Sequence, residues 1–103
     1  SYPEVKKHLM NGSVILRFLM KFSEDKTFSA LENSLANGNI EEAFRAAHTL
    51  KGLCLNLGFN DLYTPLSELT EILRAGKSDG AGELFEKVKE KYGTVINGIK
   101  NLD

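Results

Sequence analysis

The apolar residues of this chain recur at intervals of three and four, and this spacing limits the possible folds most narrowly. An α-helix has 3.6 residues per turn, so such a period places apolar side chains on one face. The clearest stretch has 3-4-3-4-3 spacing: Ile40, Ala43, Ala47, Leu50, Cys54 and Leu57. Alternating runs of Val, Ile and Thr, and a tight hairpin between them, are not found. The pattern predicts an all-α fold.

The first half of the chain is predicted to hold a short element and a long helix. The short element opens near Pro3 and stops at Asn11-Gly12. Ser13 is expected to cap the long helix, which ends before Gly38. The polar stretch "SEDK" interrupts its expected inward stripe of Val14, Phe18, Phe22, Phe28, Leu31 and Leu35.

Three further helices are predicted after Gly38. The sequence Asn39-x-x-Glu42 favours a capped start, and Gly58 ends that helix. The next runs from about 61 to 75, and Pro65 either kinks it or marks a start after Thr64. A last helix is predicted after the loop "GKSDGAG". Its expected inward residues are Leu84, Val88, Tyr92, Val95, Ile99 and Leu102. We therefore expect an antiparallel four-helix bundle with a short extra N-terminal helix.

Length and composition narrow the function classes. The 103 residues suit one domain, 1–103. The chain opens with Ser1, and excision from a longer protein such as a hybrid sensor kinase is one expectation. A net charge of −1 argues against a nucleic-acid binder. No apolar run is long enough for a membrane span, and the single cysteine fits a reducing, cytoplasmic compartment.

His48 points away from the predicted core, because the inward residues of its helix lie on another side. Its own side of the helix, within about 60°, contains Glu41, Phe44, Arg45, Lys51, Gly52 and Leu55. Lys51 is three residues on, so its ammonium can reach a group attached to the imidazole. Gly52 leaves one side of the ring open, although glycine costs a helix about 1 kcal/mol relative to alanine.

Each of these residues also has a plain structural interpretation. His48 is then an ordinary surface histidine, Lys51 a solvated charge and Leu55 a stray surface leucine. Gly52 would allow two helices to pack closely, but it faces the wrong side for that. Cys54 lies on the apolar side and is expected in the core, and His8 has no assigned role. Together, the residues around His48 suggest a nucleophile presented to a bulky macromolecule.

The chemistry open to this face is nucleophilic. A neutral imidazole is a good nucleophile, and a phosphoryl group on it would lie beside Lys51. The chain has no glycine-rich nucleotide-binding loop and no legible catalytic triad. Its two histidines, His8 and His48, lack metal-ligand spacing. We therefore expect no intrinsic cofactor, and the phosphoryl donor and its metal ion must come from a partner.

The segment "AHTLKGLCLNLG" resembles the signature of histidine-containing phosphotransfer (HPt) domains. The matching positions are His48, Leu50, Lys51, Gly52, Asn56, Leu57 and Gly58. The resemblance implies a monomeric phosphoryl carrier of multistep phosphorelays, not an autonomous enzyme. His48 would accept a phosphoryl group from a receiver-domain aspartate and pass it to another. It also implies that Lys51 supports the phosphate, that Gly52 lets the receiver approach, and that the response-regulator receiver brings Mg²⁺.

Leu53 and Leu55 are larger than the residues that many HPt domains have there. By the same resemblance, Leu55 would contact the receiver together with Phe44 and Arg45.

Two alternatives to a receiver-fed carrier stay open. The stretch "LGFNDLYTPLSELTEIL" is similar to the phosphoacceptor domain of chemotaxis histidine kinases, in which a kinase domain supplies phosphate from ATP. The second alternative is a helical interaction module that has lost the relay. Intact His48, Lys51 and Gly52 argue against it.

Overall fold

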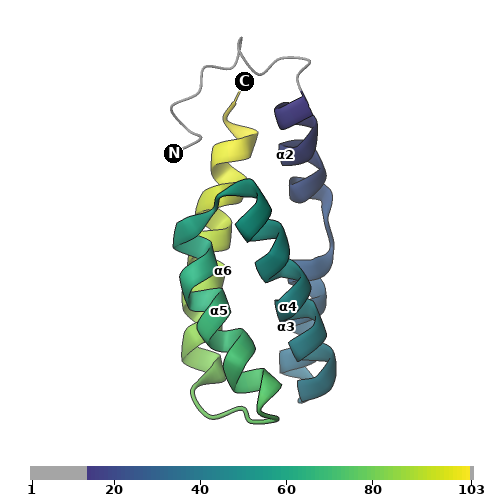
Figure 1. Cartoon of the computed structure of the whole chain (residues 1–103), viewed down its shortest axis with the longest axis vertical. Helices are drawn as coiled ribbons and strands as arrows, with labels where there is room; N and C mark the ends of the chain where they lie inside the picture. The colour runs from purple at the N-terminus through teal and green to yellow at the C-terminus, as the bar shows by residue number, and fades with distance from the viewer. Residues whose placement is uncertain (1–13, 103) are drawn as a thin grey trace.

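The computed structural model describes residues 14–102, and that part of the chain is helical with no strand. Its five helices are α2 (Val14–Glu24), α3 (Thr27–Ala36), α4 (Ile40–Leu57), α5 (Asn60–Arg74) and α6 (Ala81–Lys100). Helices α3 to α6 run alternately down and up as an antiparallel four-helix bundle, and α2 continues the direction of α3 (Figure 1). The predicted fold class is confirmed. The expected short N-terminal element lies outside the described residues, and so does Ser13, the predicted cap of the long helix that follows it.

The prediction of one long helix before Gly38 is wrong, because two helices, α2 and α3, occupy this stretch. The break falls at Asp25 and Lys26, inside the polar "SEDK" stretch. The backbone N–H of Thr27 donates to Asp25 Oδ1 over 2.8 Å. A short side chain that bonds to a backbone group two residues on stabilises a turn in competition with the helix. Asp25 therefore ends α2 locally.

The predicted inward stripe of α2 is also partly wrong. Val14 and Phe18 remain 53% and 52% exposed, whereas Leu19 and Phe22 are buried. Figure 1 shows the reason: α2 rises past the upper ends of α4 and α5, and beside it α6 continues upward. A helical period identifies the face that is apolar, but a face is buried only where a neighbouring element lies against it.

The core lies along the length of the bundle. Its fully buried side chains are mainly leucines from three helices, α3, α4 and α5: Leu31, Leu50, Leu62, Leu66, Leu69 and Leu73. Val88 contributes from α6. Aromatic rings join α3 to α6, where Phe28 stacks on Tyr92 with ring centroids 4.0 Å apart. At the surface of the same junction, Lys89 Nζ lies 3.2 Å from Glu32 Oε2. These contacts close the bundle on the side away from the α4–α5 pair.

Helix α5 passes through Pro65 without starting anew. It begins at Asn60, so the interpretation of a start after Thr64 is wrong. The Thr64 hydroxyl donates to the carbonyl oxygen of Asn60 over 3.2 Å.

Among the described helices, none combines the length and apolarity needed to cross a bilayer.

Candidate functional site

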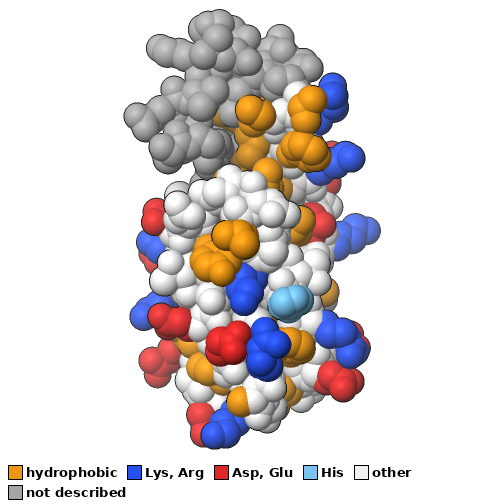
Figure 2. Space-filling model, in the orientation of Figure 1, with side chains coloured by type: hydrophobic (Ala, Val, Ile, Leu, Met, Phe, Trp, Pro, Cys, Tyr) orange, Lys and Arg blue, Asp and Glu red, His pale blue; other side chains and the backbone are white. Residues whose placement is uncertain are grey.

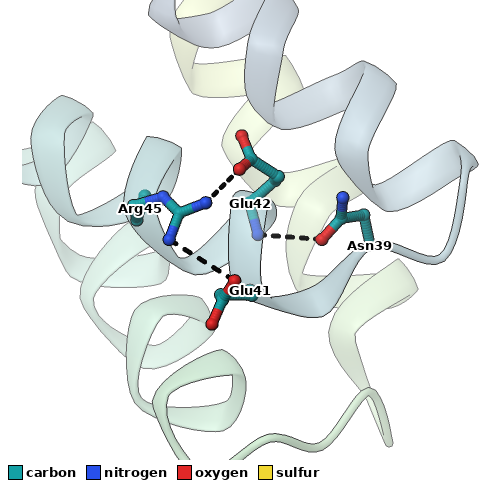
Figure 3. Close-up of polar contacts among 4 residues, drawn as sticks. All are labelled: Asn39, Glu41, Glu42 and Arg45. Atoms are coloured by element: carbon teal, nitrogen blue, oxygen red, sulfur yellow. Dashed lines mark hydrogen bonds and ion pairs between the residues drawn. The ribbon is translucent and has the colours of Figure 1, made fainter.

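Helix α4 begins and ends where the sequence predicts. Asn39 is its N-cap, and its Oδ1 accepts the backbone N–H of Glu42 over 3.0 Å (Figure 3). The reciprocal half of a capping box is not formed, because the N–H of Asn39 donates to the Ser34 carbonyl and the Glu42 carboxylate pairs with Arg45. At the other end Gly58 adopts a left-handed φ of 76°, which glycine tolerates best. Both ends of the helix that carries His48 are thus defined locally.

The orientation of α4 in the bundle follows its apolar stripe. Ala43, Ala47, Leu50 and Cys54 are buried, as predicted, and Ala46 joins them. His48 lies on the exposed side of the same helix. The imidazole is therefore presented to solvent by a rigid element whose opposite side is anchored in the core.

Gly52 has open space where a side chain would be. A Cβ built on it meets no heavy atom within 4 Å, and Gly52 is exposed. Close helix packing therefore does not explain this glycine. Three residues further along, Leu55 is 62% exposed, the most exposed large apolar residue of the described chain. Gly52 and Leu55 leave an accessible, uncharged surface next to His48.

Lys51 is half-buried on the same side of α4. Among the described residues, no carboxylate lies within ion-pair distance of its ammonium group. Its methylene groups can lie along the apolar surface while the charged end remains in water. The ammonium is therefore available to an anion attached to His48, one turn away.

The aromatic ring of Phe44 links His48 to a second helix. The Phe44 and His48 rings lie 5.8 Å apart between centroids, with an angle of 28° between their planes. Arg74, the last residue of α5, places its Cζ 4.9 Å from the centroid of the same Phe44 ring. Figure 2 shows basic side chains gathered around the histidine on this face. The sequence carries no signal that places Arg74 here, because only the packing of α5 on α4 brings it to Phe44.

Arg45, predicted as a docking residue, is engaged with the start of its own helix (Figure 3). Its guanidinium pairs with Glu42 and lies 3.5 Å from Glu41 Oε1. The hydrogen bond and charge of Glu42 raise the pKa of Arg45 above its ordinary value, with a smaller contribution from Glu41. Arg45 also lines an open polar groove between α3 and α4. Its charge is therefore partly offset by neighbouring carboxylates.

A mostly apolar pocket of about 310 Å³ opens between α2 and α4. Phe18 contributes from α2, and Leu53, Asn56 and Leu57 contribute from α4. Asn56 is exposed and stands one turn beyond Gly52. The last three residues of the sequence signature therefore have two different structural positions. Asn56 and Leu57 line this pocket, and Gly58 ends the helix.

The remaining candidate groups do not join the site. Cys54 is buried in the core, as predicted, and burial raises the pKa of its thiol to about 12. Within residues 14–102, no group of three His, Cys, Asp or Glu side chains could hold a metal ion. His8 lies outside the described residues.

Comparison with known proteins gives one finding. A family model described as the Hpt domain matches residues 18–98, which cover most of the chain and include the whole site. Neither the curated proteins nor the solved structures give a match.

Proposed function

Because the chain belongs to the Hpt domain family, whose members carry phosphoryl groups in two-component signalling, we propose that His48 is its phosphoacceptor. His48 accepts the group from an aspartyl phosphate on a response-regulator receiver domain and passes it to the aspartate of another receiver. The observation that carries this proposal is the exposed side of α4, where the imidazole, the ammonium of Lys51 and the bare Gly52 lie within about one turn.

The chemical step needs little from this chain beyond a positioned nucleophile. The unprotonated ring nitrogen of His48 uses its lone pair to form the N–P bond. The P–O bond to the receiver aspartate breaks, and the carboxylate leaves with that electron pair. The other ring nitrogen keeps its proton, so the product is a phosphoimidazolium until that proton passes to water. Transfer to the second receiver reverses these events, and both aspartyl phosphates are acyl phosphates of similar energy.

Lys51 supports the phosphoryl group electrostatically. A hydrogen bond between an ammonium and a phosphate oxygen contributes roughly 1.5–3 kcal/mol, and less where water competes. The Mg²⁺ ion that the resemblance assigns to the receiver would neutralise phosphoryl oxygens from the partner's side. In this account the chain is a monomeric cytoplasmic carrier and the receiver contributes the remaining catalytic groups.

The receiver docks over the exposed side of α4. Gly52 provides clearance for its backbone, while Phe44 and Leu55 offer apolar contact on either side of the imidazole. Arg45, already paired with two carboxylates, provides polar contact at the edge. Such transient contacts usually bury less than about 1,200 Å² in total.

The test is phosphate transfer from a phosphorylated receiver to three versions of the chain. Wild type and His8→Gln, which changes the other histidine, should both become labelled, whereas His48→Gln should accept no phosphate. The helical circular dichroism of His48→Gln should match that of wild type, because a substitution on the exposed side of α4 changes stability by only about 0.5 kcal/mol. Label on folded His48→Gln would refute the assignment. Label that comes only from ATP and a kinase domain would favour the chemotaxis-type alternative.

A further inference from the structure

The imidazole of His48 lies against an aromatic residue of its own helix. Phe44 precedes His48 by one turn, and long side chains in a helix lean back toward the preceding turn. The two ring centroids lie 5.8 Å apart, and the ring planes meet at 28°. Aromatic pairs favour offset stacking at about 4.5–7 Å between centroids, so this contact is attractive. Phe44 therefore covers part of one face of an otherwise exposed imidazole.

The Phe44 ring is itself restrained on its other sides. It is partly buried and packs against the hydrophobic core. From α5, the Cζ of Arg74 lies 4.9 Å from the centroid of the Phe44 ring. The Nε of Arg74 donates to both carboxylate oxygens of Glu71, at 3.2 and 3.3 Å, and this restrains the guanidinium in turn. A ring enclosed in this way keeps one orientation and can impose an orientation on the imidazole beside it.

The opposite side of His48 is open. Gly52 follows His48 by one turn, and a Cβ built on Gly52 meets no heavy atom within 4 Å. Along the helix, the imidazole thus has an aromatic ring on the side of the helix start and empty space on the side of the helix end. A partner can approach from the Gly52 side while Phe44 supports the imidazole from the other.

We propose that Phe44 is a positioning residue for phosphoryl transfer: its ring holds the His48 imidazole in the orientation that attacks the aspartyl phosphate of the receiver. The inference rests on the proposed function of His48. In a helix, χ1 of such a side chain has about two accessible wells and χ2 of an imidazole about two, so a free ring samples about four orientations. In-line attack on phosphorus needs one of them. Holding that orientation should raise the rate within the docked complex by up to about fourfold.

The experiment separates positioning from docking, because Phe44 also contributes to the proposed receiver interface. Transfer from a phosphorylated receiver with Mg²⁺ is measured in single turnovers at increasing receiver concentration, for wild type, Phe44→Leu, Phe44→Tyr and Leu55→Ala. Each protein gives a maximal rate and a half-saturating concentration of receiver. Leucine keeps an apolar side chain without a flat ring, tyrosine keeps the ring, and Leu55→Ala removes an apolar docking contact two turns from the histidine. Circular dichroism verifies that all four proteins are folded.

Phe44→Leu should lower the maximal rate about threefold to fourfold, as expected when the imidazole regains about four orientations. Phe44→Tyr should transfer at the wild-type maximal rate. Leu55→Ala should instead raise the half-saturating concentration and leave the maximal rate unchanged. An unchanged maximal rate in Phe44→Leu, or an equal loss in Phe44→Tyr, would overturn the inference, while transfer to wild type would still support the proposed function. No transfer to wild type would overturn both.

A second measurement needs no receiver. Protons over the face of an aromatic ring resonate upfield, so the imidazole proton signals of His48 report the stacking directly by NMR. These signals are assigned by their absence from His48→Gln. They should move toward those of a free histidine in Phe44→Leu and stay near their wild-type positions in Phe44→Tyr. Signals that do not move in Phe44→Leu would overturn the inference without touching the proposed function.

Discussion

Gly52 is the residue at which local stability and proposed function conflict most directly. It lies inside α4, away from both helix ends, and nothing in the fold occupies the space beside it. A helix interior favours alanine over glycine by about 1 kcal/mol. The bundle therefore forgoes stability at this position without a packing benefit, which supports the interpretation of Gly52 as clearance for a partner.

Replacing Gly52 separates these two effects. Gly52→Ala should raise the free energy of unfolding by up to about 1 kcal/mol in urea titrations. Gly52→Gln should remain folded but slow transfer from a phosphorylated receiver, about tenfold if the longer side chain costs docking 1.4 kcal/mol. Gly82, an equally open helical glycine in α6, is the control, and Gly82→Gln should transfer at the wild-type rate. Equal rates for the two Gln variants would contradict the clearance interpretation.

Residue positions within one helix could be predicted from the sequence, but positions across helices could not. The fixed turn per residue was sufficient to place His48 on the exposed side of α4 and Cys54 in the core. The same rule cannot place Arg74 against Phe44, because that contact depends on how α5 crosses α4. A basic residue in the last turn of a helix is common for electrostatic reasons alone, so it gave no signal of a site.

At the scale of elements, α4 depends on its N-cap. Asn39 Oδ1 satisfies the N–H of Glu42, one of the donors that a helix start leaves without an intrahelical partner. The pair between Arg45 and Glu42 lies on the surface and adds little, because exposed ion pairs contribute about 0–1 kcal/mol. The cap is therefore the main local determinant of where the helix of His48 begins.

Asn39→Ala should lower the free energy of unfolding by about 1 kcal/mol, because it leaves a helix-terminal N–H without its acceptor. Asn39→Ser, which keeps a capping oxygen, should remain close to wild type. Urea unfolding followed by circular dichroism measures both. A decrease of the same size in both variants would show that the side-chain hydrogen bond is not responsible.

Element boundaries were predictable where a residue type specifies a backbone geometry. Asn39 and Gly58 predicted both ends of α4 for that reason. The break between α2 and α3 was not predicted, although the polar "SEDK" stretch was visible, because Asp and Ser also occur on exposed faces of continuous helices. The exposure of Phe18 likewise depends on the lengths of neighbouring helices, which a helical period does not contain.

At the scale of the whole molecule, the core holds one titratable thiol. Burial raises the pKa of Cys54 from 9.0 to about 12, because the thiolate would lose its hydration inside the bundle. Below pH 9 the thiol is protonated in both the folded and the unfolded chain, so it causes no pH dependence there. Above pH 9 the unfolded chain releases this proton while the folded chain keeps it, and stability falls as pH rises.

The free energy of unfolding should therefore decrease more steeply between pH 9 and 11 in wild type than in Cys54→Ala. The difference in slope should approach, but not exceed, about 1.4 kcal/mol per pH unit for this single group. Comparing the two proteins cancels the titration of the lysines, which both contain. Tyr92 differs between them, because its pKa is raised mainly by its burial and also by the charge of Cys54. Urea titrations at several pH values measure the slopes, and parallel curves would contradict a thiol held protonated by the core.

The central claim is that His48 carries a phosphoryl group delivered by a receiver domain. The most direct measurement is to incubate the chain with a phosphorylated receiver and Mg²⁺, digest it under alkaline conditions that preserve phosphohistidine, and locate the phosphate by mass spectrometry. We predict phosphate on His48 and on no other residue of the chain. Phosphate on another residue, or none from any of several receivers that pass it to a known carrier, would contradict the claim.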